Sequence, residues 1–362
     1  MILNMKILIA MSGGVDSSVA AELLNRNGNE CIGCTMKLYD GAAQSNSCRT
    51  CCSLDDVEDA RSVAYRLGMK YYVFNFTEDF KERVINKFVE SYCSGKTPNP
   101  CIDCNRYMKF DRLLKRAETL GCDKIATGHY ARIEFKDGKY VLKKAVDSTK
   151  DQSYVLYNLT QEQLSRTLFP LGGLKKEQTR KIALENGFLN ADKPDSQDIC
   201  FVPDGDYAAF IEQAAGKAAL CGEFVDKDGN ILGNHRGIIR YTVGQHRGLG
   251  IDLPRKMYVC GINAEKNQIL LGDEKELYRN STTADDLNWI SGQPPAESFK
   301  CNVRMRYHGP EAAALVTVYG DTAQIEFETP QKSPTPGQAA VFYDGDTVLG
   351  GGIIQNENSR TF

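Results

Sequence analysis

Two cysteines lie in polar loop segments of the kind that can hold reactive thiols. Cys104 ends the run Thr97–Cys104, in which two prolines stiffen the chain just before an expected helix. Because the dipole at a helix N-terminus favours the thiolate form, we expect Cys104 to be reactive. Cys200 lies much further along the chain, in the polar segment Asp195–Phe201. An isolated cysteine is more often a small buried apolar residue, but two loop thiols that meet could divide the work, one carrying a transferable sulfur and the other attacking or resolving it.

The segment Ser12–Ser18, with the sequence SGGVDSS, could hold phosphate groups. Its two glycines allow a sharp turn between an expected strand and an expected helix, so that backbone N–H groups and the helix N-terminus face an anion. Ser17 and Ser18 add hydroxyl donors, and Asp16 could hold Mg²⁺ or polarise a neighbouring group. The segment lacks the Gly-Lys-Ser/Thr ending of the P-loop and the third glycine of the dinucleotide fingerprint. A plain glycine-rich turn with a Ser or Asp cap is the simpler alternative, which the position between strand and helix disfavours.

The first 200 residues alternate short apolar runs with amphipathic stretches of helical period, which is typical of a parallel sheet covered by helices on both faces. The expected buried strands are Lys6–Ala10, Cys31–Met36, Tyr71–Phe76 and Lys124–Thr127. The expected helices are Val19–Asn25, Leu54–Leu67, Phe80–Tyr92 and Met108–Leu120. Asp137-Gly138 predicts a surface hairpin, and Leu159–Asn186 is expected to be mostly helical and basic. Such sheets bind ligands at the carboxyl ends of their strands, where Ser12–Ser18 lies.

After about residue 205 the pattern changes to short apolar runs separated by turns. Tyr258–Ile262 and Gln268–Leu271 predict a hairpin, and five later runs predict a small antiparallel barrel. These runs are Val303–Tyr307, Ala313–Val318, Ala323–Phe327, Ala339–Tyr343 and Val348–Ile354. We therefore expect an α/β domain with a Rossmann-like parallel sheet and a helical insertion at residues 1–205, a small central mixed or β domain at 206–280, and a C-terminal antiparallel β-barrel at 281–362.

The composition is that of a globular protein, with 362 residues, 42% hydrophobic and 25% charged. We expect no membrane span, because the sequence has no apolar run near the roughly 18 residues that one needs. The N-terminus has no basic leader and runs straight into the first strand, so we expect no signal peptide. Thirteen cysteines without a signal indicate a reducing cytoplasm, with some thiols kept for chemistry. The net charge of −3 argues against a strongly basic nucleic-acid coat protein, but it leaves room for a local basic face.

The segment Ser12–Ser18 resembles the pyrophosphatase loop, or PP-loop, of ATP enzymes that adenylate a carbonyl oxygen and release pyrophosphate. Further segments, taken in order, make the chain similar to the tRNA-specific 2-thiouridylase family within that superfamily. They are Thr97–Asn105, Ala126–Ala131, Lys150–Tyr154, Asp195–Phe201, Thr242–Gly250 and Thr335–Ala339. The resemblance covers nearly the whole chain. It implies an ATP-binding catalytic domain with a helical tRNA-binding insertion at residues 1–205, a small central domain and a C-terminal β-barrel.

The resemblance implies an ATP-dependent sulfurtransferase that 2-thiolates the wobble uridine of tRNAs of the Lys, Glu and Gln types. The 2-carbonyl oxygen of uracil would attack the α-phosphate of ATP, bound with Mg²⁺, and AMP would leave when sulfur replaces the oxygen. A persulfide on Cys200 would supply the sulfur, and Cys104 would be the nucleophile, ending in a Cys104–Cys200 disulfide. The residues implied to bind ATP are Ala10, Met11, Ser12, Gly13, Gly14, Val15, Asp16, Ser17, Met36 and Gly128. Those implied to contact tRNA are Asn99, Pro100, Cys101, His129, Lys150, Asp151, Gln152, Arg306, Tyr307 and Gln338.

Two partners follow from the resemblance: tRNA, and an upstream sulfur donor that is a persulfide carrier protein or a cysteine desulfurase. A membrane partner is not expected. For the basic stretch Lys175–Lys181 taken alone, a solvated helix face is the simpler interpretation than RNA binding.

Cys101 is a departure from the family pattern, which often has an aspartate, taken as a general acid/base, three residues before Cys104. Cys101, Cys104 and Cys200 could instead hold an iron–sulfur cluster with one iron open to sulfide. Persulfide chemistry is favoured over the cluster, and zinc would need a fourth ligand. A second group of cysteines is unexplained: Cys48, Cys51 and Cys52.

Two other functions fit parts of the sequence. An amidoligase or synthetase of the PP-loop superfamily, acting on a small metabolite, would use Ser12–Ser18 but would leave Cys104, Cys200 and the barrel without a role. An RNA-binding protein that has lost catalysis would be expected to have lost the loop or the cysteines, and both are present.

Overall fold

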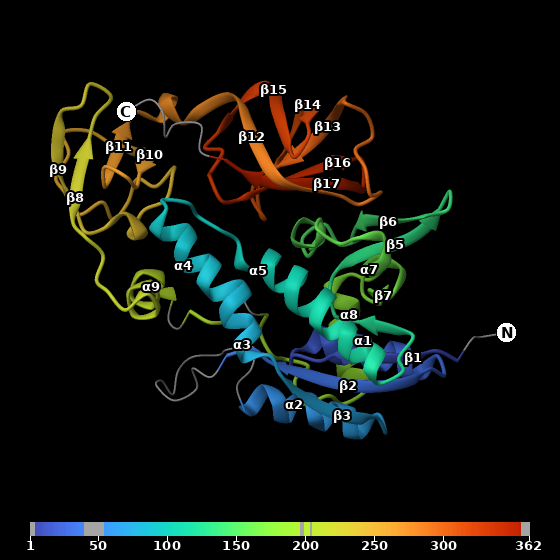
Figure 1. Ribbon diagram of the computed structural model, residues 1–362. Helices are drawn as coiled ribbons and strands as arrows, with labels where there is room; N and C mark the ends of the chain where they lie inside the picture. Colours follow the sequence, from blue (N-terminus) through green and yellow to red (C-terminus); the bar gives the residue numbers. More distant parts are fainter. Residues whose placement is uncertain (1–3, 40–53, 196–198, 203–204, 356–362) are drawn as a thin grey trace.

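A five-stranded parallel sheet forms the N-terminal part of the protein, as the computed structural model shows (Figure 1). The structure describes residues 4–39, 54–195, 199–202 and 205–355. The strands are β1 (Lys6–Ala10), β2 (Glu30–Lys37), β3 (Lys70–Asn75), β4 (Lys124–Ala126) and β7 (Thr167–Leu168). Their order across the sheet is β3-β2-β1-β4-β7, and every neighbouring pair is parallel. The predicted Rossmann-like sheet is confirmed.

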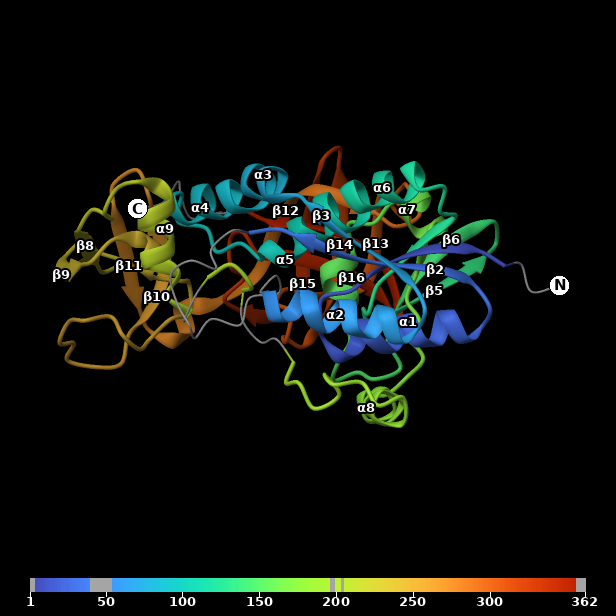
Figure 2. The ribbon, with the colours of Figure 1, turned by 90° about the horizontal axis from the view of Figure 1, so that it is seen from below.

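Helices cover both faces of this sheet, and the side chains of β1 point alternately to one face and the other. The helices are α1 (Val15–Arg26), α2 (Leu54–Arg66), α3 (Thr77–Phe80), η2 (Lys81–Ile85), α4 (Asn86–Cys93), α5 (Pro100–Asp103), η3 (Cys104–Arg112), α6 (Leu113–Thr119), η4 (Ser153–Leu156), α7 (Gln161–Ser165) and α8 (Lys176–Glu185). Ile7 and Ile9 belong to the cluster formed with α1, α2 and α8. Leu8 and Ala10 belong to the cluster formed with η3 and α6 on the other face, and Figure 2 shows the two layers. Alternation with a period of two is what a covered strand requires.

The strand β3 lies at an edge of the sheet. Tyr72 and Val73 are 41% and 44% exposed, so the prediction of a buried strand over Tyr71–Phe76 was wrong in its burial. Aromatic and β-branched residues favour strands in general. An apolar run therefore predicts a strand without telling an edge strand from a central one.

The small central domain is built on a four-stranded mixed sheet in the order β10-β11-β8-β9. Its elements are α9 (Tyr207–Ala215), β8 (Gly222–Val225), β9 (Ile231–His235), η6 (Ile238–Arg240), β10 (Tyr258–Asn263) and β11 (Gln268–Gly272). The predicted hairpin is confirmed, because β10 and β11 pair antiparallel. The β11–β8 pair is parallel, which gives the sheet its mixed character.

The C-terminal domain is a barrel of six antiparallel strands, closed by pairing of β12 with β17. It comprises η7 (Glu274–Leu277), β12 (Tyr278–Trp289), β13 (Ser298–Arg304), β14 (Glu311–Tyr319), β15 (Thr322–Lys332), β16 (Ala339–Asp344) and β17 (Thr347–Ile354). Five strands were predicted, and β12 was missed. Its buried positions include only small side chains, Thr282 and Ala284, so the apolar alternation that marks a strand is weak there.

One hairpin of the N-terminal half extends the barrel sheet. The strands β5 (Ala131–Lys136) and β6 (Lys139–Lys144) are joined by Asp137 and Gly138, which both have positive φ, as the predicted two-residue turn requires. Lys143 on β6 pairs with Thr347 on β17. The predicted domain boundaries at residues 205 and 280 therefore stay a proposal, because the pairing of β6 with β17 joins the first domain to the barrel.

Candidate active site

The segment Ser12–Ser18 follows β1 at the carboxyl edge of the sheet. Gly14 is the N-cap of α1, and Val15–Ser18 form the first turn of that helix. Ser17 Oγ accepts a hydrogen bond from the Ser12 N–H at 3.2 Å and donates one to the Gly14 carbonyl at 3.0 Å. Gly13 has φ +75°, and a Cβ there would lie 2.4 Å from the Asp56 carbonyl oxygen. Only glycine fits this position, because the turn passes close to the backbone of Asp56. Phosphate binding by this loop stays a prediction.

Gly128, which follows β4, lies against the start of α1. A Cβ at this position would approach the Ser17 nitrogen to 2.7 Å and the Asp16 carbonyl carbon to 2.8 Å. Met11 is buried, and its N–H donates to the Cys34 carbonyl on β2 at 2.7 Å. Met36 is only partly buried near the end of β2. The residues expected to surround ATP thus come from three adjacent strand ends.

Lys176 joins the loop Ser12–Ser18 to the segment that leads to Cys200. Its ammonium donates to Asp16 Oδ1 and Oδ2 at 2.7 and 2.8 Å and lies 2.7 Å from Asp195 Oδ1. Asp195 also accepts from Lys150 at 2.8 Å. Burial would raise the pKa of the Asp195 carboxyl, but the hydrogen bonds from Lys150 and Lys176 outweigh it and hold that pKa below its usual value.

The sequence interpretation of Lys175–Lys181 as a solvated face fails at Lys176. This residue is buried, whereas the Lys181 side chain is 77% exposed. The helical period of α8 alone could not distinguish the buried Lys176 from the exposed Lys181, because both partners of Lys176, Asp16 and Asp195, lie outside this helix.

Asn190 and Lys193 make further contacts with the loop Ser12–Ser18 and with Asp56, which lies against it. Asn190 Nδ2 donates to the Gly13 carbonyl and to Ser18 Oγ, both at 2.9 Å. Lys193 pairs with Asp56 at 2.6 Å and with Asp59 on α2 at 2.7 Å. No motif predicts either contact, because Asn190 and Lys193 lie outside the segments that point to chemistry.

Replacing Lys176 by Met is expected to destabilise the protein by about 1–3 kcal/mol near neutral pH, because Asp16 and Asp195 would then face each other without their shared cation. The folded-state pKa of Asp195 is depressed, so its contribution is present above the unfolded-state pKa and is lost as pH falls through the folded-state value. The difference between the free energies of unfolding of wild type and variant should therefore shrink below about pH 4. Urea unfolding at a series of pH values measures it. Lys181→Met is the matched control, and an equal loss in both variants would contradict the prediction.

The helix that carries the thiols begins at Pro100, earlier than the expected start at Met108. Asn99 caps it, with its side chain accepting from the Cys101 N–H at 3.1 Å, and Pro100 occupies the first helical position. Cys104 therefore lies one turn inside, where the dipole effect has fallen off, and the expectation of Cys104 at a helix N-terminus was wrong. An Asn-Pro pair is a known start signal that the sequence interpretation overlooked.

The three thiols of the predicted chemistry differ in exposure. Cys101 is exposed, Cys104 is 9% exposed and Cys200 is partly buried. Cys104 is a member of a large apolar cluster against which Cys200 packs. Phe201, next to Cys200, makes ring contacts in this cluster with Phe80, Phe88 and Phe210 at centroid distances of 5.5, 5.3 and 5.2 Å. The fold thus brings Cys104 and Cys200 to one apolar cluster, while Cys48, Cys51 and Cys52 lie outside the described residues.

A metal site is not formed by the side chains that the structure describes. Within residues 4–39, 54–195, 199–202 and 205–355, no three His, Cys, Asp or Glu side chains are grouped to hold a metal ion. The arrangement of Cys101, Cys104 and Cys200 therefore does not support the iron–sulfur alternative. Asp103, beside Cys104 in sequence, is paired with Lys87 at 2.7 Å, and burial raises the pKa of its carboxyl in spite of that lysine.

The loop before Asn99 is the point where the three domains meet. Thr97 donates its N–H to the Pro336 carbonyl of the barrel at 2.8 Å and its hydroxyl to Thr242 Oγ1 of the central domain at 3.2 Å. Gln338 Nε2 donates to the Thr97 carbonyl at 2.7 Å. A Cβ on Gly337, whose φ is +89°, would lie 2.9 Å from the Thr97 nitrogen. Gln338, a predicted tRNA contact, thus helps to fix the loop.

Gly337→Ala is expected to lower the thermal midpoint by about 2–4 °C more than Gly345→Ala. Both glycines have positive φ, so both variants carry backbone strain, but a Cβ on Gly345 meets nothing within 4 Å. Only the Gly337 variant pushes the barrel away from Thr97. Differential scanning calorimetry of the two variants measures the difference, and equal midpoints would contradict it.

Several other predicted tRNA contacts already have partners within the protein. Asp151 accepts from the Ala145 N–H at 3.0 Å and from Arg304 at 3.2 Å. Gln152 Oε1 accepts from the Tyr130 N–H at 2.9 Å. Arg306 donates to Thr335 Oγ1 at 2.8 Å. Burial raises the pKa of Tyr307 to about 12.

His129 is buried, and its ring contacts the rings of Phe110 and Phe169, which also contact each other. Burial, with Lys109 beside it, holds the pKa of its imidazole well below the usual value, so the ring is neutral. The Lys109 ammonium lies 3.4 Å from Nε2 and can only donate, which leaves the ring proton on Nδ1, 2.6 Å from Thr127 Oγ1. These contacts orient the segment around Gly128, and the tRNA contact of His129 stays a prediction.

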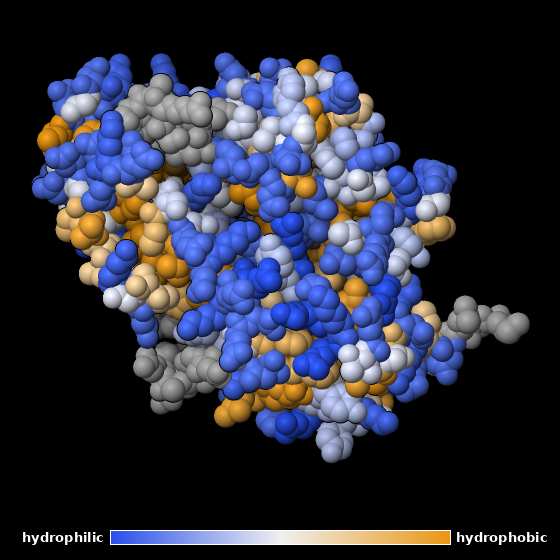
Figure 3. All heavy atoms as spheres, viewed as in Figure 1, coloured by the Kyte–Doolittle hydropathy of each residue, from blue (hydrophilic) through white to orange (hydrophobic). Residues whose placement is uncertain are grey.

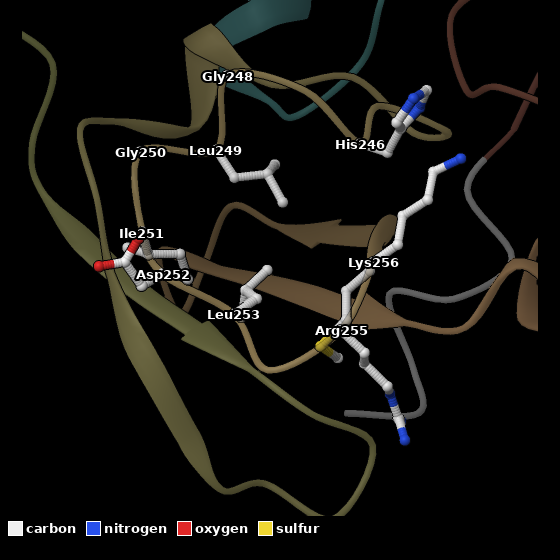
Figure 4. Close-up of a pocket in the computed structure, with 10 residues that line it drawn as sticks. His246, Gly248, Leu249, Gly250, Ile251, Asp252, Leu253, Arg255 and Lys256 are labelled. Atoms are coloured by element: carbon white, nitrogen blue, oxygen red, sulfur yellow. The ribbon is translucent and has the colours of Figure 1, made fainter.

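A pocket of about 420 Å³ lies apart from these residues, in the loop that precedes β10 (Figure 4). Leu249 and Leu253 point into it, and the side chains of Arg255 and Lys256 extend outward. His246 also lines it. We assign no catalytic role to this pocket.

Comparison with known proteins covers all three domains. Residues 5–204 match the family model described as the tRNA methyl transferase HUP domain, residues 208–273 its PRC-barrel domain, and residues 279–354 the aminomethyltransferase beta-barrel domain. The chain is 50% identical over 355 residues to the tRNA-specific 2-thiouridylase MnmA of Clostridium acetobutylicum, covering 98% of this chain and 100% of that protein. The chain belongs to the tRNA-specific 2-thiouridylase family.

Two other 2-thiouridylases are similar to this chain over nearly their full length. The protein of Acetivibrio thermocellus is 52% identical, covering 97% of this chain and 99% of that protein, and the protein of Clostridioides difficile is 49% identical, covering 98% and 99%. Two of the family models are described as tRNA methyl transferase domains, whereas the relatives that match over their full length are named tRNA-specific 2-thiouridylases. Among solved structures, a 4-thiouridine synthetase–RNA complex with bound ATP aligns at a TM-score of 0.36 and 19% identity, over 59% of this chain and 50% of that one, which is too low to support an argument.

Proposed function

We propose that this protein is an ATP-dependent sulfurtransferase that converts the wobble uridine of tRNA to 2-thiouridine. The observation that carries the proposal is the pairing, in one domain, of an anion-binding loop at the sheet edge with two cysteines on one apolar cluster. Identity of about half the residues to 2-thiouridylases over nearly the full chain supports the same reaction.

The first step is activation of the uracil 2-carbonyl. Its oxygen attacks the α-phosphate of ATP, pyrophosphate leaves, and the carbon now bears AMP as a leaving group. Backbone N–H groups at Gly13 and Gly14 and the N-terminus of α1 suit the pyrophosphate, because both present positive dipoles to it. Asp16, which could have held Mg²⁺, accepts from Lys176 with both oxygens, so no step is assigned to a metal.

The second step is sulfur transfer. The terminal sulfur of a Cys200 persulfide attacks the activated carbon and displaces AMP, which leaves the base joined to Cys200 through two sulfurs. The Cys104 thiolate then attacks the Cys200 sulfur, and the S–S bond breaks with its electron pair on the base, giving 2-thiouridine and a Cys104–Cys200 disulfide. A reductant then restores both thiols.

The substrate is proposed to bind across the meeting point of the domains. Hydrophilic residues cover most of the boundary between the N-terminal domain and the barrel on the face shown in Figure 3, which suits contact with RNA. Arg83 and Arg106 lie over the ring of Tyr107, 5.7 and 5.5 Å from its centroid. Arg83 is exposed, whereas Arg106 and Tyr107 are half-buried and Arg106 pairs with Asp286. The exposed Arg83 suits contact with the RNA backbone beside an unstacked anticodon base. The persulfide is proposed to come from a carrier protein or a cysteine desulfurase.

No helix in the described part of the chain is long and apolar enough to cross a membrane. We propose that the protein acts in the cytoplasm, where tRNA and the sulfur donor are found.

The proposed function is tested by incubating the protein with ATP, a persulfide donor and unmodified tRNA for Lys, Glu or Gln. Nucleoside mass spectrometry should detect 2-thiouridine, formed with one AMP and one pyrophosphate per product. A small-molecule amidoligase would make no 2-thiouridine under these conditions. Product formed by protein without iron or acid-labile sulfide would argue against a cluster, whereas a strict need for iron would overturn the persulfide mechanism.

A further inference from the structure

Cys101 lies where it can react with the Cys104 sulfur. It is the second residue of the helix that starts at Pro100, and the Asn99 cap fixes its backbone through the 3.1 Å hydrogen bond. Cys104, three residues later, donates its N–H to the Cys101 carbonyl. Both cysteines are therefore held by one short stretch of regular backbone.

Helix geometry places the Cα atoms of Cys101 and Cys104 at a separation that disulfides span. A rise of about 1.5 Å and a turn of about 100° per residue separate the Cα atoms of residues three apart by about 5 Å. Disulfides span Cα distances of about 4.4–6.8 Å. On a regular helix, however, the Cβ atoms of residues three apart lie about 5–6 Å from each other, compared with about 3.5–4.5 Å in a disulfide. A Cys101–Cys104 disulfide therefore needs side-chain rotation together with a small shift of the first helical turn.

The two thiols also differ in access. Cys104 is 9% exposed, inside the cluster that contains Phe88 and Phe201, whereas Cys101 is exposed. A dithiol reductant must approach a disulfide sulfur in line with the S–S bond, so it can reach a disulfide at Cys101 more readily than one at Cys104. The positive end of the helix dipole also favours the thiolate in the first turn.

We propose that Cys101 is a third catalytic thiol, which resolves the Cys104–Cys200 disulfide left by sulfur transfer. This inference rests on the proposed function. The Cys101 thiolate attacks the Cys104 sulfur, the bond to Cys200 breaks, and its electron pair leaves on Cys200 as a thiolate. One disulfide replaces another, so the step needs no oxidant. An external dithiol then reduces Cys101–Cys104 through the exposed Cys101 and is itself oxidised to a disulfide, while Cys200 is ready for the next persulfide.

The first test maps the disulfide after one turnover. Wild type, Cys101→Ser and the control Cys93→Ser, an exposed cysteine on α4, are loaded with persulfide and given ATP and tRNA without reductant. Acid quench, alkylation and non-reducing peptide mass spectrometry should find Cys101–Cys104 in wild type and control, and Cys104–Cys200 in Cys101→Ser. If wild type makes 2-thiouridine but retains only Cys104–Cys200, the inference is wrong and the proposed function stands. If wild type makes no 2-thiouridine, both fall.

The second test needs no turnover. In Cys200→Ser, mild oxidation with oxidised dithiothreitol should join Cys101 to Cys104, and failure to form that bond would overturn the inference. In a third measurement with limiting dithiol and saturating tRNA, the ratio of steady-state to single-turnover rate should fall about tenfold in Cys101→Ser relative to wild type. Cys93→Ser should keep the wild-type ratio. An unchanged ratio in Cys101→Ser would also overturn the inference.

Discussion

Replacing Cys200 by serine is expected to abolish 2-thiouridine formation, a loss of about 10³-fold or more, while ATP binding is retained. A serine hydroxyl cannot carry a persulfide, and no other step supplies the sulfur atom. Cys200 is partly buried against the apolar cluster, and serine is close to it in size, so the fold should survive. Nucleoside mass spectrometry measures the product, and equilibrium dialysis with labelled ATP measures the affinity.

The matched control is Cys221→Ser, which changes an exposed cysteine beside β8 in the central domain. This variant should thiolate tRNA at the wild-type rate. If Cys200→Ser still made 2-thiouridine with a persulfide donor, the sulfur would have to travel by another residue. A loss of ATP binding in Cys200→Ser would instead indicate that the substitution disturbs the fold.

Gly128→Ala is expected to weaken ATP binding and thiolation by about 10²-fold. The added methyl would lie 2.7 Å from the Ser17 nitrogen and 2.8 Å from the Asp16 carbonyl carbon, and both are backbone atoms. Backbone atoms cannot rotate away, so the first turn of α1 must shift relative to β4. That turn supplies the N–H groups for the phosphates, and a displacement near 1 Å spoils their alignment.

Gly173→Ala serves as the control, because a Cβ at Gly173 meets nothing within 4 Å and its φ is not positive. Isothermal titration with ATP should give wild-type affinity for this variant. Equal affinity in both variants would show that the phosphates do not depend on the contact between Gly128 and α1. The experiment thus tests the loop geometry separately from the thiols.

Local chemistry made much of the fold readable from the sequence. The alternation of Ile7 and Ile9 with Leu8 and Ala10 predicts a strand covered on both faces, and the glycines at Gly13 and Gly14 predict a tight turn after it. These features depend on neighbours within a few residues, which is why β1 was predicted with its observed ends. The Asp137-Gly138 turn was readable for the same reason.

Weak local signals account for the errors in the fold. The strand β12 buries small residues and carries many polar ones, so its alternation is faint. The helix starting at Pro100 was taken for a loop because proline usually disfavours helix, although at the first helical position its missing N–H costs nothing.

The sequence by itself indicated which groups could do chemistry: a glycine-rich turn at Ser12–Ser18 that could bind phosphate, and the thiols of Cys104 and Cys200. Only the tertiary structure decided that Lys176 is shared by Asp16 and Asp195, and that Thr97 is held by the barrel and the central domain. The physical reason is range. Turns, caps and strand faces are set by residues a few positions apart. The pairing of Lys176 with Asp16 and the contacts of Thr97 with the other two domains join residues more than 100 positions apart, and whether such residues meet depends on how the whole chain packs.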